Sequence, residues 1–460
     1  MCKNIIMQHN KLEFEIAVRS MVKKIWPHYE LPLAKLMKNP RTGAPAILPE
    51  DWDSRAELIS FALHDPQVAF VWGNDIAYSQ LEIWHPYIMA SKHRFTVIAN
   101  NINPSMVEKQ NLLLKQTQPY SLKKNFKIEY LNAAPSLKTL IYISDKNNNY
   151  NFLRKLQNKI HVCGHHGDSE KHSSFSTMPN SYDFLLLADQ ISMLRYIKGG
   201  LELPINKIIP IGNTVIPNVN YCEGKSLFTK AIYAPTFEGY SESVNYSSLM
   251  RASNHITNWS NSNNNSLYFR PHPGTGLREK SYITYIDKIK ASITPIKVEE
   301  KSEQFNWSDF IVTDISGIIS EYLFTGKPII IPVSTDPKWL RDYIIDLSLD
   351  SYIYIWDYNQ LTLSQFIESI KHDPLQNSRI TRRNAIYLGI KSFEKSLELF
   401  DEAITYFEYA YQWRQLRTGK NYTQDSLSLR KYPLPNNQDL KKIVSNIKSG
   451  LFAQRKFDLS

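Results

Sequence analysis

Cysteine and long apolar runs are scarce in this sequence of 460 residues. The cysteines are Cys2, Cys163 and Cys222, without a CxxC pair, so they can form neither a disulfide framework nor a zinc knuckle. No stretch reaches the roughly 18 apolar residues needed to span a bilayer, and the N-terminus lacks the apolar core of a secretory signal. We therefore expect a cytoplasmic protein without a membrane-spanning segment.

Several nucleotide and nucleic-acid signatures are also missing. Without a Walker-type phosphate loop or a dinucleotide fingerprint, the sequence argues against an ATP-dependent kinase and a nicotinamide enzyme. The balance of 54 basic against 44 acidic residues favours an anionic partner, but no nucleic-acid-binding motif is present. We expect no nucleic-acid partner. A non-catalytic module that binds an anionic polymer is an alternative from another class.

The excess positive charge is concentrated at the C-terminus. From Tyr411 to Ser460 ten basic residues stand against three acidic ones, which gives +7 of the total +10. Apolar side chains, including Trp413, Ile443 and Leu451, are interleaved with these charges. The pattern favours an element on an anionic membrane surface, with a solvated helical tail packed on the body as the alternative.

Short apolar runs recur from Val68 onward, at spacings that leave room for helices between them. The first series is Val68–Gly73, Phe95–Asn100, Thr139–Ser144, Ile160–Gly164, Phe184–Ala188 and Ile208–Gly212. The second series is Lys230–Phe237, Ser266–Pro273, Thr294–Val298, Asp309–Asp314, Lys327–Val333 and Ser351–Asp357. Such runs are typical of buried parallel strands. They predict an α/β protein with two Rossmann-like domains that face a cleft, joined by a hinge near Pro217 to Lys225.

The predicted organisation has four parts. A helical leader takes residues 1–65, the first Rossmann-like domain 66–220 and the second 221–375. Helices and the basic tail take residues 376–460. A stripe of apolar residues at helical spacing in the last part predicts a core-facing helix: Phe393, Leu397, Phe400, Ile404, Phe407 and Tyr411.

Ligands of open parallel sheets bind at the carboxyl ends of the strands, so polar residues that follow the apolar runs are site candidates. The first such segment is CGHHGDSEKHSS, from Cys163 to Ser174, in which histidines and charged residues crowd a glycine-containing turn. A histidine there can act as a general base, and Asp168 or Glu170 can orient its imidazole. A polar loop with Asp168 or Ser169 as helix N-cap, and a metal site, are the alternatives.

Two further segments carry the same kind of signal. In RPHPGTG, from Arg270 to Gly276, two prolines stiffen the backbone around His272, and the following glycines let a phosphate approach the main chain. A structural turn histidine is the competing interpretation. In TDISG, from Thr313 to Gly317, hydroxyls stand where a strand gives way to a helix, whose free amides favour anions. An ordinary capped helix explains this segment alone equally well.

Taken in order, the segments HHGDSEKHSS, YAPTF (Tyr233 to Phe237), RPHP and TDISGIISEYLFTGKPIII resemble the CDP-glycerol glycerophosphotransferase family of teichoic-acid and capsule polymerases. The resemblance covers about Lys159 to Val333. It implies a GT-B-like fold, with the acceptor on the first domain and the nucleotide donor on the second. The implied reaction transfers glycerol or ribitol phosphate from a CDP-alditol to a polysaccharide or lipid-linked acceptor, on the inner face of the cell membrane.

The resemblance also implies roles for individual residues. His166, with Asp168 beside it, is expected to deprotonate the acceptor hydroxyl, and His272 to contact the donor phosphates and help the cytidine phosphate leave. The remaining expected donor-binding residues are Thr236, Arg270, Thr313, Asp314, Ser316 and Gly317. No metal ligand is predicted, and no cofactor beyond the donor substrate; a requirement for a divalent ion stays open.

The sequence departs from the family's pattern at two motifs. Ile315 and Gly317 replace the aromatic residue and the second serine of the family's Thr-Asp-Tyr-Ser-Ser signature, and Asp168 follows the His-Gly pair where many members have threonine. A histidine-proline motif with a downstream serine motif also occurs in transferases that use CMP-sugars. The alternative is therefore a glycosyltransferase with a CMP-sialic acid or CMP-Kdo donor, in which Asp168 or Glu170 would gain importance over His166.

Overall fold

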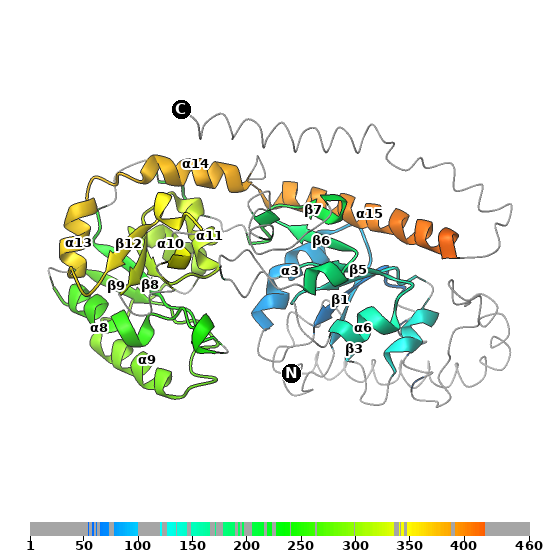
Figure 1. Cartoon of the computed structure of the whole chain (residues 1–460), viewed down its shortest axis with the longest axis horizontal. Helices are drawn as coiled ribbons and strands as arrows, with labels where there is room; N and C mark the ends of the chain where they lie inside the picture. The colour runs from blue at the N-terminus through cyan, green and yellow to red at the C-terminus, as the bar shows by residue number, and fades with distance from the viewer. Residues whose placement is uncertain are drawn as a thin grey trace, which may run out of the picture.

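A computed structural model of the chain contains two parallel β-sheets, each flanked by helices (Figure 1). The structure describes Ser54, Leu58, Phe61 and residues 65–72, 78–99, 120–121, 127–134, 136–144, 149–165, 171, 178–188, 192–193, 196, 205–215, 219–222, 227–239, 241–262, 265–298, 300–334, 340, 342–344, 347–387 and 392–418. Most of the predicted helical leader and nearly all of the basic tail lie outside the described residues.

The first sheet has the order β3-β2-β1-β4-β5-β6-β7, and its paired strands are parallel. Its strands are β1 (Val68–Trp72), β2 (Phe95–Ala99), β3 (Tyr120–Ser121), β4 (Thr139–Tyr142), β5 (Ile160–Cys163), β6 (Phe184–Leu187) and β7 (Ile208–Pro210). Because β1 pairs with both β2 and β4, the strand order reverses there. This is the doubly wound arrangement, which forms a crevice at the carboxyl ends of the strands.

The strands of the first sheet are apolar on both faces because helices cover both faces. Residues of β1 alternate between two buried clusters, with Ala69 and Val71 in one and Phe70 and Trp72 in the other. Helix α6 (Asn149–Lys155) contributes to the first cluster, and helix α3 (Tyr78–Ala90) to the second. Continuous apolar runs are the expected sequence pattern for such strands.

The last described helix packs on the first sheet, although it follows the second sheet in sequence. Helix α15 (Phe393–Thr418) lies along the first unit, as Figure 1 shows, and places the predicted apolar stripe in the cluster around Trp84. Phe400 stacks against Phe95 at a ring-centroid distance of 5.8 Å. Near the helix end, Arg414 pairs with Asp183 at 2.5 Å. The core-facing stripe is confirmed, and its partner is the N-terminal sheet.

The second sheet has the order β12-β11-β10-β8-β9, again with parallel pairs. Its strands are β8 (Lys230–Ala234), β9 (Ser266–Phe269), β10 (Phe310–Thr313), β11 (Ile329–Val333) and β12 (Tyr354–Asp357). Its helices are α8 (Leu249–Ser260), α9 (Ser281–Ser292), α10 (Lys301–Trp307), α11 (Ile318–Tyr322), α13 (Leu363–Ile370) and α14 (Gln376–Tyr387). β8 pairs with β9 and β10, which makes the β8/β10 boundary the switch point of this sheet.

A turn and a buried ion pair fix two helices of the second unit. Helix α11 continues into a short 3-10 turn that ends at Gly326, whose φ of 72° is the left-handed conformation typical of a glycine after a helix. Helix α14 is held to the sheet through Arg379, which forms a buried ion pair with Asp373. Tyr354 of β12 donates to the same carboxylate at 2.7 Å.

The structure corrects one predicted strand and adds another. Thr294–Val298 was expected to form a strand, and this prediction is wrong: Thr294 and Pro295 are exposed and the segment pairs with no described strand. Proline cannot donate to a sheet ladder, and the Val298 carbonyl accepts from Gln304 Nε2 at 3.1 Å instead. The added strand is β3, which is too short to produce a recognisable apolar run.

The predicted domain boundaries remain predictions, although the two sheets bracket the predicted hinge. β7 ends at Pro210 and β8 begins at Lys230. Within this interval Cys222 donates its backbone amide to the Thr325 carbonyl at 2.9 Å, so residues 219–222 contact the second unit. Among the described residues, no helix combines the length and the apolar character that crossing a membrane requires.

Candidate active site

Asp314 forms the centre of the switch point in the second sheet. It follows β10 directly and is only 1% exposed. One carboxylate oxygen accepts from the Thr236 amide at 2.7 Å, and the other from the Ser248 amide at 3.1 Å. The carboxylate therefore ties the loop after β8 to the loop that leads into α8.

Burial dominates the electrostatics of Asp314. Desolvation raises the pKa of its carboxyl to about 6, against the lowering effect of hydrogen bonds from Ser248 and Thr236 and of the nearby Arg251 charge. Tyr233 lies in the same cluster and bonds Ser248 Oγ at 3.1 Å. The two loops thus depend on a carboxylate that is costly to bury and carries several hydrogen bonds.

The other residues of TDISG occupy distinct positions. Thr313 is fully buried, and its hydroxyl donates to the Ala234 carbonyl at 2.8 Å, which links β10 to β8. Ile315 packs into the apolar cluster of the second unit. Ser316 and Gly317 are partly buried and immediately precede α11. The roles expected of these residues in donor binding stay predictions.

The RPHP segment places His272 at the carboxyl end of β9. Its backbone amide donates to the Pro235 carbonyl at 3.2 Å, and its Nδ1 accepts from the Gly274 amide at 2.9 Å. Nδ1 is thus an acceptor, which assigns the proton of the neutral ring to Nε2. The ring lies tilted against Phe237 at a centroid distance of 5.0 Å, and the residue is exposed at the sheet edge.

Arg270 is positioned by the element beneath it. Its guanidinium donates to Gln304 Oε1 on α10 at 2.8 Å, and the Gln304 amide in turn donates to Tyr268 Oη at 2.9 Å. A guanidinium held by a neutral acceptor keeps its positive charge available. Arg270 and His272 therefore lie in the same turn, as the RPHP pattern predicted. Gln304 holds the arginine side chain, and the Gly274 amide holds the histidine ring.

Glu238 shapes the glycine-containing loop after His272. This buried carboxylate accepts from the backbone amides of Gly276, Arg278 and Glu279 at 3.0 to 3.1 Å. Burial acts to raise its pKa, but these backbone hydrogen bonds hold the pKa below the ordinary value. Gly276 has a φ of 82°, and an added Cβ would lie 2.5 Å from Ile283 Cγ1, so the turn requires glycine.

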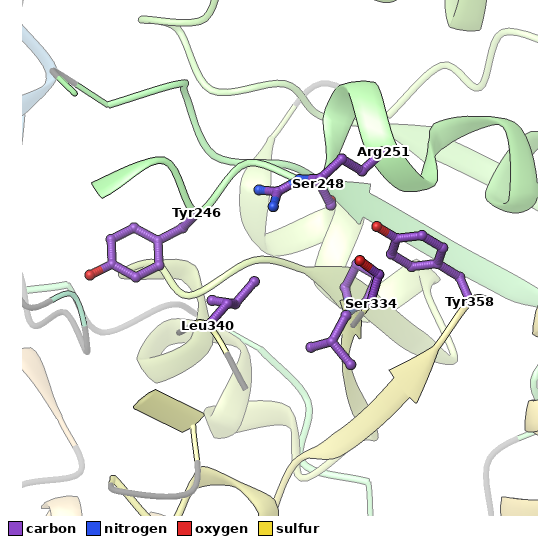
Figure 2. Close-up of a pocket in the computed structure, with 8 residues that line it drawn as sticks. Tyr246, Ser248, Arg251, Ser334, Leu340 and Tyr358 are labelled. Atoms are coloured by element: carbon purple, nitrogen blue, oxygen red, sulfur yellow. The ribbon is translucent and has the colours of Figure 1, made fainter. Parts of the chain in front are cut away.

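A pocket opens beside Asp314 at the carboxyl ends of β11 and β12, and Figure 2 shows the side chains around it. Its lining consists of Tyr246, Ser248, Arg251, Pro332, Val333, Ser334, Leu340 and Tyr358. Arg251 is fixed by the carbonyl of Ser247, to which Nε donates at 3.1 Å, and by that of Asn245. The lining combines apolar and polar side chains with one cation that backbone carbonyls hold in place.

The same pocket contains the site residues that sequence reasoning missed. Ser248 immediately precedes α8 and Arg251 lies in its first turn, a segment without a recognised motif, and Tyr358 follows β12. Tyr358 follows an apolar strand, as the predicted site residues do, so the sequence pattern does mark it. Arg251 follows no strand, so nothing in its sequence context marks it.

Lys171 connects the two units. It lies in the HHGDSEKHSS segment that follows β5, and its Nζ donates to Thr236 Oγ1 at 2.7 Å. The ammonium also lies 4.9 Å from the centroid of the Phe237 ring. Burial lowers its pKa to about 8, while Asp314 acts to raise it. The two units therefore meet at Lys171, whose ammonium lies beside the loop that follows β8.

The turn before Lys171 is described only as far as His165. His165 has a φ of 57°, which is unusual for a residue other than glycine, and its ring faces Tyr196, with Nε2 at 2.8 Å from the phenol oxygen. Its carbonyl accepts from Trp84 Nε1 at 2.7 Å. His165 is thus partly buried against the first unit. His166 and Asp168 lie outside the described residues, and their catalytic roles stay predictions.

The described part of the chain holds no group of three or more histidine, cysteine, aspartate or glutamate side chains placed to bind a metal ion. The polar groups of the site are instead suited to a phosphorylated ligand. Arg270 and His272 after β9, together with Arg251 and Lys171 near Asp314, provide cations and N–H donors. Such donors are the usual partners of phosphate oxygens.

The chain is an α/β protein with two parallel sheets, as the sequence predicted. Residues 217–341, which contain the switch-point site, match the family described as CDP-Glycerol:Poly(glycerophosphate) glycerophosphotransferase. The resemblance inferred from the motifs is thereby confirmed over this segment. No curated protein sequence matches the chain.

Solved structures with a similar fold include two kinds of protein. S. aureus MnaA with UDP has 13% identity over 74% of this chain and 96% of its own, with a TM-score of 0.49. The wall teichoic acid polymerase TagF with CDPG has 14% identity over 77% of this chain and 93% of its own, with a TM-score of 0.44. A UDP-GlcNAc 2-epimerase from Neisseria meningitidis has 14% identity over 72% and 99%, with a TM-score of 0.43.

Proposed function

We propose that this protein transfers glycerol phosphate from CDP-glycerol to a hydroxyl of a cell-envelope polymer. One observation carries the proposal: the family match covers the segment that contains Thr236, His272 and Asp314. These residues come from three different strand ends and converge at the switch point of the second sheet. The proposed donor site is thus the part of the chain for which both the family and the geometry agree.

The proposed reaction breaks the phosphoanhydride bond of the donor. The acceptor oxygen attacks the phosphorus that carries glycerol, the bond to the cytidine phosphate breaks, and a phosphodiester forms. The acceptor proton passes to a base and CMP leaves with the bonding electron pair. Catalysis then requires alignment of the two substrates and neutralisation of charge on CMP.

The described residues suit the donor half of this reaction. His272 Nε2–H and the Arg270 guanidinium are proposed to bind the diphosphate, because both follow β9 and neighbouring groups hold their side chains in place. Arg251 and Tyr358 are proposed to hold the nucleoside part in the pocket of Figure 2. Thr313, Ser316 and Gly317 are proposed as supports of the phosphate-facing turn, with Asp314 and Thr236 as its anchor.

The acceptor half of the proposal rests on the sequence. His166 is proposed as the base that takes the acceptor proton, oriented by Asp168. The acceptor is proposed to be a teichoic-acid or capsular chain at the inner face of the membrane, reached through the basic tail. Glycerol rather than ribitol is proposed because the matching family is described by CDP-glycerol.

Calorimetry with four donors tests this proposal: CDP-glycerol, CDP-ribitol, CMP-sialic acid and CMP-Kdo, each with wild type and with His272→Ala. We expect CDP-glycerol to bind most tightly and His272→Ala to weaken it about tenfold, because a charge-assisted contact to phosphate is lost. Preferential binding of CDP-ribitol would identify ribitol phosphate, in place of glycerol phosphate, as the transferred group. Binding confined to a CMP-sugar would overturn the proposal in favour of the glycosyltransferase, and no binding of any donor would overturn both.

A further inference from the structure

The chain crosses between the two units twice, and the two crossings are bonded to each other on the first unit. The first crossing leaves after β7, and the second leads from α14 to α15, as Figure 1 shows. Ser396, near the start of α15, donates its hydroxyl to the carbonyl of Ile211, which follows β7, at 2.6 Å. Tyr87 Oη lies 2.7 Å from the same hydroxyl, and Ser396 is fully buried. The start of the first crossing is therefore bonded to the end of the second.

The first crossing is also fixed where it reaches the second unit. The Asn220 amide donates to a side-chain oxygen of α10 at 2.7 Å, and the Cys222 amide donates to the Thr325 carbonyl at 2.9 Å. Between them, the Tyr221 ring packs closely on Gly326, where an added Cβ would lie 2.6 Å from Tyr221 Cε2. This segment is therefore held against the second unit.

The second crossing contacts this segment through α14. The guanidinium carbon of Arg383 lies 4.4 Å from the centroid of the Tyr221 ring, which is a cation–π contact. Arg383 Nε is buried and has no hydrogen-bond partner among the described residues, so stacking and not hydrogen bonding holds this end of the side chain. One turn earlier, Arg379 Nε donates to the Gly326 carbonyl at 3.2 Å. The two crossings are therefore joined at the second unit as well.

We propose that Tyr221 and Arg383 are positioning residues for the transfer reaction: by joining the two crossings at the second unit, they set how the two units face each other. Two connections that are joined at both ends leave less freedom of rotation than two separate tethers. This inference rests on the proposed function, because that reaction takes its donor from the second unit and its base from the first. A misplacement of about 1 Å between reacting groups can lower a rate about 100-fold.

The neighbouring residue of α14 provides a matched control. The guanidinium carbon of Arg382 lies 5.2 Å from the centroid of the Tyr352 ring, so this contact is of the same kind but lies within the second unit. Arg382→Met and Arg383→Met each remove one guanidinium from the same helix, and only Arg383→Met separates the crossings. A cation–π contact is weak beside core packing, so both variants should fold.

The test compares wild type with Arg383→Met, Arg382→Met, Tyr221→Leu and Tyr221→Phe in three measurements. Release of CMP from CDP-glycerol gives kcat, which depends on the alignment of both units. Calorimetry with CDP gives the affinity of the donor site on the second unit alone. Small-angle X-ray scattering gives the distribution of distances between the units without any reaction. Thermal unfolding verifies that each variant folds.

We expect Arg383→Met and Tyr221→Leu to lower kcat about tenfold or more, to change CDP affinity less than about threefold, and to broaden the distance distribution. Tyr221→Phe keeps the aromatic face and should retain most of the activity. Arg382→Met should match wild type in all three measurements. Unchanged kcat or unchanged scattering in Arg383→Met would overturn the proposal. An equal effect of Arg382→Met, or a loss of CDP affinity as large as the loss of kcat, would also overturn it.

The scattering measurement separates a failure of this inference from a failure of the proposed function. If wild type does not release CMP from CDP-glycerol, the proposed function fails. The comparison of Arg383→Met with Arg382→Met then still decides whether the contact fixes the arrangement of the units. A broadened distribution in Arg383→Met alone would support this role, and identical distributions would overturn it.

Discussion

Thr236 donates its backbone amide to Asp314 across the boundary between β8 and β10, at 2.7 Å. The bond joins the ends of two strands at the position where the strand order of the second sheet reverses. It therefore holds together the loops that form the proposed donor site. Ligand sites of doubly wound sheets lie at this position because the loops on its two sides diverge.

Asp314→Asn should lower both the stability of the fold and the affinity for the donor. An amide cannot accept from both the Thr236 and the Ser248 N–H, so one buried donor loses its partner and the free energy of unfolding falls by about 2 kcal/mol. CDP-glycerol affinity should fall at least about tenfold, measured by calorimetry. Asp309→Asn is the control, because Asp309 accepts from the Thr229 and Lys230 amides at the opposite end of β10. If Asp309→Asn lowers donor affinity equally, the effect is not local to the site.

His272→Asn and His272→Ala should differ in stability but not in catalysis. Asparagine Oδ1 can accept from the amide two residues later, as His272 Nδ1 does from Gly274, so the turn should persist. Both variants lack the Nε2–H donor, and kcat should fall about 100-fold or more in each. Release of CMP from CDP-glycerol measures kcat. Thermal unfolding measures the stability that the intact turn contributes. Full activity in His272→Asn would show that the Nε2 donor has no part in the reaction.

The stability of the first unit should depend on pH through His161. Burial lowers the pKa of this imidazole to about 4, although Asp183 acts to raise it. The ring bonds Tyr142 Oη at 2.8 Å and the Leu156 carbonyl at 3.0 Å. The unfolded histidine takes up a proton near pH 6.5 and the folded one does not, so the free energy of unfolding falls by about 2 kcal/mol between pH 7 and pH 5.

Urea unfolding of wild type and His161→Gln at both pH values isolates this contribution. The variant has no imidazole, so it should lose about 2 kcal/mol less than wild type on acidification. Equal losses would assign the pH dependence to other groups.

Phe400→Ala should destabilise the first unit although Phe400 follows the second unit in sequence. Its ring packs with Phe70, Trp84 and Phe95, and removing it leaves a cavity that costs about 4 kcal/mol. Hydrogen exchange should show lost protection in β1 and β2, with β8 and β10 unchanged. Trp413→Ala is the control, because Trp413 is 51% exposed on the same helix. A loss of protection in the second sheet instead would contradict this assignment.

The fold was largely predictable because buried parallel strands produce continuous apolar runs. The run at Thr294–Val298 misled because apolar composition does not distinguish a strand from an exposed segment beside Pro295. The sequence predicted the apolar stripe of α15, but it did not predict that the stripe packs on the first sheet. Periodicity identifies the buried face of a helix and not the element against which that face packs.

The candidate site was predictable where its residues follow strands. His272, Arg270, Thr236 and Asp314 do so, and the structure brings them to one edge of the second sheet. Arg251 lies within a helix and Lys171 in the other unit, and both reach this edge through tertiary contacts. Contacts between residues far apart in the chain cannot be predicted from the local sequence.

Product analysis tests the central claim most directly. Wild-type protein is incubated with bacterial envelope polymer and either CDP-glycerol or a CMP-sugar, and the products are followed by ³¹P NMR and chromatography. The account predicts that CDP-glycerol is consumed, with one CMP released for each new phosphodiester on the polymer. Consumption of a CMP-sugar in place of CDP-glycerol, or CMP release without a new phosphodiester, would contradict it.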